Sequence, residues 1–194
     1  MPDTVASKSL LRARLRASRR QLGEAERNSA ALALCRHVID LPLWSRARRV
    51  ALYMAGDGEI PTGPLAALCR TAEKRLFLPV MGSDRTLSFI AWETGVPLVR
   101  NGFGIEEPPA GAEPVDVAQL DIIFMPLVGW DRQGGRLGMG GGYYDRSLNG
   151  VRGPLLVGLA YALQETPRLP RDEWDVPLDF VVTELAAHRC RPAD

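Results

Sequence analysis

The residues with the clearest capacity for chemistry lie in one short segment, Gly134 to Arg146, which reads GGRLGMGGGYYDR. Six of its first nine residues are glycine. The run lies seven residues after the apolar stretch DIIFMP and directly precedes a helix-like sequence. Glycines let backbone N–H groups converge on an anion, and a following helix N-terminus adds partial positive charge. The segment therefore predicts a phosphate-binding loop. A flexible hairpin is the structural alternative, and neither the GK[ST] of a P-loop nor a complete GxGxxG is present.

Four side chains beside the glycines have assignable chemistry. Arg136 can pair with phosphate oxygens, and Tyr143 and Tyr144 offer flat faces for a ring together with a hydroxyl. Asp145 can hold a Mg²⁺ ion that screens phosphate charge. On residue type alone, either tyrosine could equally belong to the core.

A second group of charged residues lies near the N-terminus. Lys8, Arg12, Arg16 and Arg19 follow one another at helical spacing, while leucines occupy another face. Residues 1–49 hold 11 Lys and Arg against 4 Asp and Glu, a net charge of +7, whereas the remainder holds 13 against 19, a net charge of −6. This asymmetry indicates a polyanionic ligand, either nucleic acid or a small phosphorylated molecule. A solvated helix face is the alternative for Lys8 and Arg12.

The elements that must position these residues alternate between helix and strand. Helices are predicted from Ser7 to Leu22, from Glu24 to Asp40, from a Thr62 cap to Lys74, and from the glycine loop to Leu148. Short apolar runs bounded by Gly, Pro or charge predict strands at Arg49–Met54, Arg75–Val80, Leu87–Trp92, Asp121–Met125, Leu155–Ala160 and Phe180–Thr183. Asn101 to Pro114 is interpreted as a Gly/Pro-rich connector, and the C-terminal HRCRPAD as a basic end. The pattern predicts an α/β fold: a mainly parallel sheet with helices on both faces, in a Rossmann-like three-layer architecture.

Composition agrees with one globular α/β domain over residues 1–194, at 46% hydrophobic and 24% charged residues. No run approaches the roughly 18 apolar residues of a membrane span, and no secretory signal is recognisable, so we expect a cytoplasmic protein that does not bind membranes. The three cysteines are far apart and form no CxxC pair, which argues against a disulfide framework or a zinc site. His37 and His188 stand beside no carboxylate or serine in a recognisable arrangement.

Four motifs together resemble a known family. The run DIIFMPLVGWDRQGGRLGMGGGYYDR is similar to the signature of 5-formyltetrahydrofolate cyclo-ligases, which is close to PG-x-A-F-D-x-x-G-x-RLG-x-GGGYYDR. A K-x-x-x-R pair on an N-terminal helix, an E-[IV]-x-T element after a strand, and a late D-x-P-L-D-x-[IV]-[IV]-T-E are also present, in the family's order. The chain departs from the family pattern at Leu127, Trp130, Met139 and Gly141. With little charge in the loop itself, Arg136, Lys8 and Arg12 would do more of the phosphate neutralisation.

The resemblance implies ATP- and Mg²⁺-dependent conversion of 5-formyltetrahydrofolate to 5,10-methenyltetrahydrofolate, with release of ADP and phosphate. Glu59, Arg136 and Tyr144 would be catalytic, and Met54, Glu59 and Tyr144 would line the folate pocket. Asp145 and Asp175 would bind Mg²⁺. The ATP-binding residues would be Lys8, Arg12, Arg136, Leu137, Gly138, Met139, Gly140, Gly141, Gly142, Tyr143 and Tyr144.

Several of these residues have ordinary structural interpretations when taken alone. Met54 can simply end a core strand, Glu59 can be a loop residue near Thr62, and Asp175 can be a turn residue before Val176 and Pro177. The resemblance favours the functional interpretation for all three. We also expect a monomer whose partners are folate and ATP.

Two other functions compete with this one. A nucleic-acid-binding protein could use the arginine-rich first helix as a phosphate grip, but no nucleic-acid module is recognisable and the body is acidic. Another α/β enzyme handling sugar phosphates or coenzyme A would not predict Glu59, Arg136, Tyr144 and Asp175 together.

Overall fold

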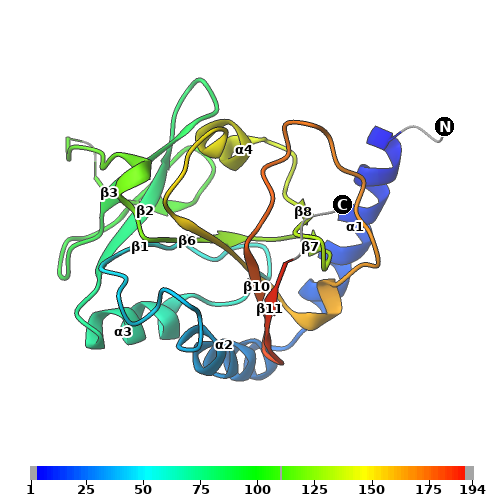
Figure 1. Ribbon diagram of the computed structural model, residues 1–194, viewed down its shortest axis with the longest axis horizontal. Helices are drawn as coiled ribbons and strands as arrows, with labels where there is room; N and C mark the ends of the chain where they lie inside the picture. Colours follow the sequence, from blue (N-terminus) through cyan, green and yellow to red (C-terminus); the bar gives the residue numbers. More distant parts are fainter. Residues whose placement is uncertain (1–3, 110, 191–194) are drawn as a thin grey trace.

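The computed structural model describes residues 4–109 and 111–190, and its centre is a seven-stranded sheet (Figure 1). The strand order is β11-β10-β9-β6-β1-β2-β3. The five central strands pair in parallel, whereas β3 and β11 pair antiparallel at the two edges. The strands are β1 (Arg49–Ala51), β2 (Arg75–Met81), β3 (Leu87–Ala91), β6 (Ile122–Pro126), β9 (Leu155–Leu159), β10 (Phe180–Val182) and β11 (Ala187–Arg189).

Helices cover both faces of this sheet. Figure 1 shows α2 and α3 below the sheet, α4 above it, and α1 along one side. The helices are α1 (Thr4–Arg20), α2 (Glu24–Val38), α3 (Gly63–Thr71) and α4 (Tyr143–Leu148), with short 3-10 turns η1 (Val117–Gln119) and η2 (Ala162–Gln164). The predicted fold class is therefore confirmed. None of the helices within the described residues is long and apolar enough to cross a membrane.

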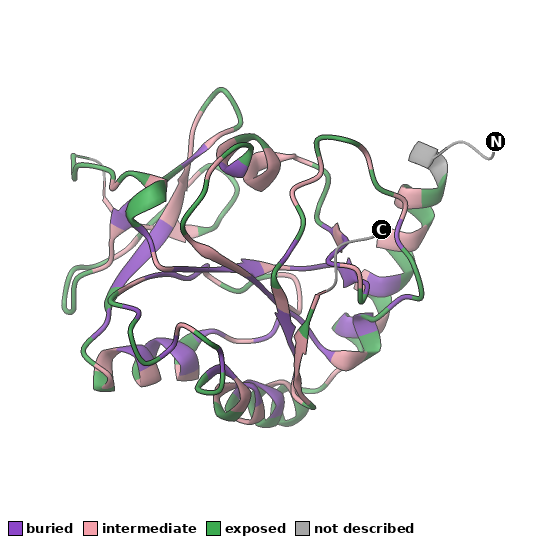
Figure 2. Cartoon of the chain, in the orientation of Figure 1, coloured by how far each residue is buried: buried purple, intermediate pink, exposed green. Residues whose placement is uncertain are grey.

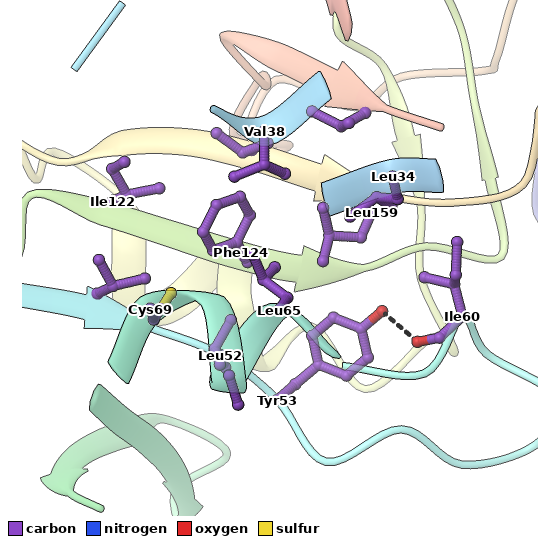
Figure 3. Packing of buried hydrophobic residues seen from close by; sticks show 14 of the residues in the cluster. Leu34, Val38, Leu52, Tyr53, Ile60, Leu65, Cys69, Ile122, Phe124 and Leu159 are labelled. Carbon is purple, nitrogen blue, oxygen red and sulfur yellow. Dashed lines mark hydrogen bonds between the residues drawn. The ribbon is translucent and has the colours of Figure 1, made fainter. Parts of the chain in front are cut away.

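Alternation along the strands explains why both faces are covered. In β6, Ile122 and Phe124 belong to the core cluster under α2 and α3, while Ile123 and Met125 belong to the cluster on the opposite face. Successive side chains of a strand point to opposite faces, so a strand that is apolar throughout must be buried on both. Buried residues accordingly run along the strands and the inward sides of the helices (Figure 2). Figure 3 shows the first cluster, in which Phe124 packs among leucines and valines near Leu34 and Leu65.

The predicted helices and strands all exist, with ends shifted by a few residues. Two small ribbons are additional: β4 (Val99–Arg100) with β5 (Glu106–Glu107), inside and beside the predicted connector, and β7 (Gly129–Trp130) with β8 (Arg136–Leu137). The C-terminal segment is also not merely a basic end, because residues 187–189 form the edge strand β11. Residues 191–194 of that segment lie outside the described chain.

Thr62 precedes α3 as predicted but does not cap it with its side chain. Its hydroxyl donates to the carbonyl of Tyr53 at 2.8 Å, and no side-chain cap bond forms. The Tyr53 hydroxyl in turn donates to the Ile60 carbonyl at 3.4 Å (Figure 3). These bonds tie the segment that follows β1 to the start of α3, so the intervening loop carrying Glu59 is held at both ends.

The strand order places two loops side by side. From β1 the chain proceeds to β2 on one side of the sheet, whereas β6 lies on the other side of β1 and leads on to β9 and β10. Ligands in open α/β sheets bind outside the carboxyl ends of strands at such a reversal. The loop after β1 carries Met54 and Glu59, and the segment after β6 carries the glycine loop.

Candidate active site

The glycine-rich segment divides into a hairpin turn and an exposed loop. Gly134 and Gly135 are buried in the turn between β7 and β8, whereas residues 138–140 are exposed. Asp131, fully buried, organises the turn: its carboxylate accepts the N–H groups of Gln133 at 3.0 Å, Gly135 at 2.8 Å and Leu169 at 2.8 Å. The predicted phosphate loop is therefore limited to residues 138–142. For Gly134 and Gly135 the alternative interpretation, a hairpin, is correct.

Asp131→Ala is expected to lower the free energy of unfolding by about 3 kcal/mol, because three backbone N–H groups, two of them buried, would lose their acceptor. Urea denaturation measures this loss. The control is Asp116→Ala, since Asp116 is exposed and accepts one N–H, from Ala118. That control should lose about 1 kcal/mol or less. Equal losses in the two variants would show that Asp131 does not anchor the hairpin.

Two arginines lie against the exposed loop. Arg12 Nε donates to the Gly138 carbonyl at 2.8 Å, and Arg146 Nη1 donates to the Gly141 carbonyl at 2.7 Å. Gly142, the N-cap residue just before α4, has a φ of 71°, a left-handed conformation that favours glycine. Tyr143, the first residue of α4, places its ring beside Gly141. Arg146 was not among the predicted site residues, yet it brings a positive charge to the loop that Met139 and Gly141 themselves lack.

Leu137 has a different position from the rest of the predicted ATP-binding run. Its side chain is buried in a small cluster with Leu15, Val128 and Leu169, and Leu11 packs at the edge. This cluster docks α1 onto the β7–β8 ribbon. Leu137 therefore supports the helix that carries Lys8 and Arg12, and its side chain is not presented to the loop surface.

Arg136 faces inward and joins three segments. Its guanidinium, 7% exposed, donates to the Asp145 carboxylate on α4 and to the carbonyl of Val176. The Val176 N–H donates to the same Asp145 oxygen at 3.1 Å. Burial lowers the pKa of Arg136, and the Asp145 carboxylate opposes that shift. Arg136 thus connects Asp145 on α4 to the backbone of Val176, the residue that follows Asp175.

Lys8 reaches the same region from α1. Its Nζ lies 2.7 Å from Asp172 Oδ2 and 3.0 Å from Asp175 Oδ2, with the lysine side chain 13% exposed. Asp175 also accepts the N–H of Asp172 at 2.9 Å. Burial alone would lower the pKa of Lys8, but the hydrogen bonds that its ammonium donates to both carboxylates raise that pKa above its ordinary value. Asp172 is a further member of the site that sequence reasoning missed.

The two predicted metal ligands, Asp145 and Asp175, converge through Val176. Among the described residues, no group of three or more metal-ligating side chains is present. Mg²⁺ bound with a nucleotide usually takes one or two carboxylates, phosphate oxygens and several waters, so a pair of carboxylates fits it. Hydrogen bonds within the described chain engage Oδ1 of Asp145 and Oδ2 of Asp175, which leaves the other oxygen of each carboxylate available.

The loop after β1 holds the second half of the site. Glu59 Oε2 accepts the Gly56 N–H at 3.0 Å, and the carboxylate is largely buried, with the side chain 13% exposed. Burial raises the pKa of Glu59, although the Gly56 hydrogen bond and the charge of Arg19 act against this. Burial also raises the pKa of Tyr144, and the Glu59 charge adds to the shift, so the tyrosine is a neutral phenol facing the carboxylate. Met54 is half-buried and packs against the core under α3.

A cluster of arginines joins this loop to α1. Asp57, whose φ is 51°, binds Arg16 at 2.7 Å and Arg19 at 2.7 Å, and also pairs with Arg20. Burial alone would raise the pKa of Asp57, but hydrogen bonds from these arginines hold it well below its usual range. The predicted cationic stripe is therefore engaged with the protein itself: Lys8, Arg12, Arg16 and Arg19 all have intramolecular partners. These contacts argue against two alternatives: that this side of α1 is simply a solvated surface, and that it binds nucleic-acid phosphates.

Comparison with known proteins identifies the family. The model of the 5-formyltetrahydrofolate cyclo-ligase family matches residues 4–184. The chain belongs to the 5-formyltetrahydrofolate cyclo-ligase family. A cyclo-ligase of that name from Haemophilus influenzae is 37% identical over 173 residues, covering 87% of this chain and 92% of the relative. The one from Escherichia coli K12 is 36% identical, covering 87% and 96%.

Solved structures of similar proteins support the same conclusion. An NMR structure of Aquifex aeolicus 5,10-methenyltetrahydrofolate synthetase superposes with a TM-score of 0.84 at 38% identity, covering 96% of this chain and 94% of that one. A 5,10-methenyltetrahydrofolate synthetase from Mycoplasma pneumoniae has a TM-score of 0.75 at 25% identity, covering 91% and 98%. The chain is therefore an enzyme of the cyclo-ligase family, as the four motifs predict.

Proposed function

We propose that this cyclo-ligase uses MgATP to convert 5-formyltetrahydrofolate to 5,10-methenyltetrahydrofolate, releasing ADP and phosphate. The observation that carries the proposal is the path of α1. One part of this helix places Lys8 and Arg12 at the glycine loop and the acidic pair, and its other end contacts the loop that holds Glu59. A phosphate-binding half and a carboxylate-bearing half are thereby joined in a single chain, which supports action as a monomer.

The reaction needs a better leaving group than a formamide oxygen. The formyl oxygen attacks the γ-phosphorus of ATP, the bond to the β–γ bridging oxygen breaks, and ADP leaves. N10 then attacks the activated formyl carbon and loses its proton, the carbon–oxygen bond breaks, and phosphate departs with the former formyl oxygen. Phosphoryl transfer depends chiefly on positioning and charge stabilisation, so cations and backbone donors suffice without a protein nucleophile.

The phosphate half of the site supplies these groups. The exposed loop from Gly138 to Gly142 offers backbone N–H groups, with Arg12 and Arg146 beside it. Lys8, now paired with Asp172 and Asp175, is within reach of the same region and would turn toward the phosphates when they bind. Asp145 and Asp175 would hold Mg²⁺, which neutralises phosphate charge. Arg136 contributes by orienting Asp145.

The folate half is the segment after β1 together with α4. The Glu59 carboxylate would accept hydrogen bonds from the amino and ring N–H groups of the pterin, and Met54 and Tyr144 would pack against its ring. The neutral Tyr144 phenol can also donate a hydrogen bond to a substrate oxygen. This arrangement would place the formyl group between Glu59 and the phosphate loop.

Purified protein incubated with 5-formyltetrahydrofolate should produce the methenyl absorbance band when MgATP is supplied and none when ATP is omitted. One ADP should form for each methenyl product. Product at equal rates without ATP, or no product with it, would refute the proposed function.

Arg12→Met is expected to raise the KM for ATP about tenfold, because a charged hydrogen-bonding group beside the phosphates contributes about 1.5 kcal/mol. Steady-state kinetics with saturating folate measures the change. Arg14→Met on the exposed side of α1 is the matched control and should leave the KM for ATP unaltered. If both variants behave like the unmodified enzyme, Arg12 does not contact the nucleotide.

A further inference from the structure

A buried arginine connects the two halves of the site. The side chain of Arg19 is 0% exposed, although it carries a full charge. Its Nε donates to the Asp57 carbonyl at 2.9 Å, Nη1 to the Leu127 carbonyl at 2.9 Å, and Nη2 to the Asp57 carboxylate at 2.7 Å. Leu127 directly follows β6 and Asp57 follows β1, so Arg19 spans the two loops at the reversal of strand order.

The same guanidinium faces Glu59. Arg19 Nη2 lies 3.6 Å from Glu59 Oε1, the carboxylate oxygen that the Gly56 N–H does not bind. Burying a charge is costly unless it is paired and hydrogen-bonded. Arg19 therefore both orients the Glu59 carboxylate and supports its ionised form.

The loop is shaped to accept this arginine. Asp57 and Gly58 have φ angles of 51° and 75°, and a Cβ on Gly58 would lie 3.3 Å from Cα of Arg20 and 3.4 Å from the Arg19 carbonyl. The loop backbone thus approaches the end of α1 closely. The leucine cluster already docks α1 onto β7 and β8. Holding the helix in place therefore does not require the three hydrogen bonds and the ion pair that the buried Arg19 makes.

We propose that Arg19 is a positioning residue that fixes the Glu59 carboxylate, and with it the folate half of the site, to the nucleotide-binding helix α1. This inference rests on the proposed function, because it takes Glu59 as the group that receives the folate. Arg19 itself touches neither substrate. Its effect should therefore appear in folate binding and in the pH at which that binding is lost.

Charged and titratable groups face Glu59 from every side. Arg19 and Arg16 come from α1 and Asp57 from the same loop, and the phenols of three tyrosines lie around them: Tyr53, Tyr144 and Tyr161. The arginines lower the pKa of Glu59 and Asp57 raises it. Removing the Arg19 charge would raise the pKa of Glu59 further. Folate binding that needs the ionised carboxylate would then fail at a higher pH than in the unmodified enzyme.

The test compares Arg19→Met with Arg20→Met in the full-length protein. Arg20 also pairs with Asp57 but is 54% exposed and makes no ion pair with Glu59. Equilibrium titration with 5-formyltetrahydrofolate in the absence of ATP gives Kd across a pH series. Arg19→Met should raise Kd about tenfold. It should also move the acid limb of the profile, where binding weakens as the pH falls, to higher pH. Arg20→Met should stay within about twofold, as for an exposed ion pair.

Several results would overturn the proposal. Unaltered folate binding in Arg19→Met would overturn it. Equal losses of folate and ATP affinity, with the acid limb of folate binding at its original pH, would also overturn it, because that is the pattern of a merely structural role. If Arg19→Met does not fold, Arg19→Lys keeps the charge but cannot span all three partners. It should weaken folate binding a few-fold with the limb at its original pH. Unweakened binding in that variant contradicts the proposal.

A double variant adds a second readout. If Arg19 acts through Glu59, Arg19→Met should weaken folate binding much less in a Glu59→Gln background than in the unmodified enzyme. Full additivity would contradict the proposal. Failure of the proposed function is recognised separately, since it appears as absent ATP-dependent product in the unmodified enzyme whatever the value of Kd.

Discussion

Arg136→Ala is expected to lower kcat/KM for MgATP by about 10²–10³-fold, the range seen when one preorganised charge-stabilising group is removed. The residue is 7% exposed and bonded to Asp145 and Val176, so it acts from behind the site. Without it, Asp145 loses the partner that ties it to the segment at Val176, next to Asp175. We therefore expect most of the effect to be a lower kcat and an altered dependence of activity on Mg²⁺ concentration. Steady-state kinetics over a Mg²⁺ series can measure both.

Arg132→Ala is the matched control for that experiment. Arg132 lies in the same hairpin and also pairs with a carboxylate, Glu165, but it is largely exposed. It should retain activity close to that of the unmodified enzyme. Arg136→Ala could instead fold and keep its activity and Mg²⁺ dependence. That result would show that the contacts of Arg136 with Asp145 and Val176 have no part in the reaction.

Glu59→Gln should raise the KM for 5-formyltetrahydrofolate about 100-fold while leaving the KM for ATP nearly unchanged. The glutamine has the same shape but presents an amide group where the pterin N–H groups need an acceptor. The matched control is Glu184→Gln, because Glu184 also accepts a backbone N–H, from Ala162 at 2.9 Å, away from the glycine loop. Equal effects of the two substitutions would contradict a role for Glu59 in folate binding.

The same residue predicts a pH dependence. Burial raises the pKa of Glu59 above the ordinary value of 4.5. The proposed contact with the pterin N–H groups requires the ionised carboxylate. Folate binding should therefore be complete above this raised pKa and weaken as the pH falls through it. The acid limb should lie above pH 4.5 and disappear in Glu59→Gln. A limb that persists unchanged in the variant would belong to another group.

Sequence patterns predicted the main elements because those elements have strong local causes. β6 is apolar throughout, which requires burial on both faces, and α1 combines an apolar row with a cationic one. The ribbons β4–β5 and β7–β8 were missed because each contains only two pairs of residues. Their formation depends on hairpin anchors such as the buried Asp131, whose role is invisible in the residue type.

The candidate site was only partly predictable for a similar reason. Lys8, Arg12 and the glycines stood out by type and spacing. Arg12 does contact the glycine loop, and Lys8, one turn away on α1, contacts Asp172 and Asp175. The inward orientation of Arg136 and the burial of Arg19 could not be foreseen, because their partners lie far along the chain: Leu127 is 108 positions from Arg19, and Val176 is 40 positions from Arg136. Helical spacing placed Arg19 on a cationic face, but only tertiary packing shows that this face is turned toward Asp57.

We propose that ATP activates the formyl oxygen at a site shared by the glycine loop and Glu59. The most direct measurement follows that oxygen. 5-Formyltetrahydrofolate labelled with ¹⁸O in the formyl group is converted with unlabelled MgATP, and the released phosphate is analysed by mass spectrometry. We expect one labelled oxygen in each phosphate that forms together with the methenyl product. Unlabelled phosphate, with the label released to water, would contradict it.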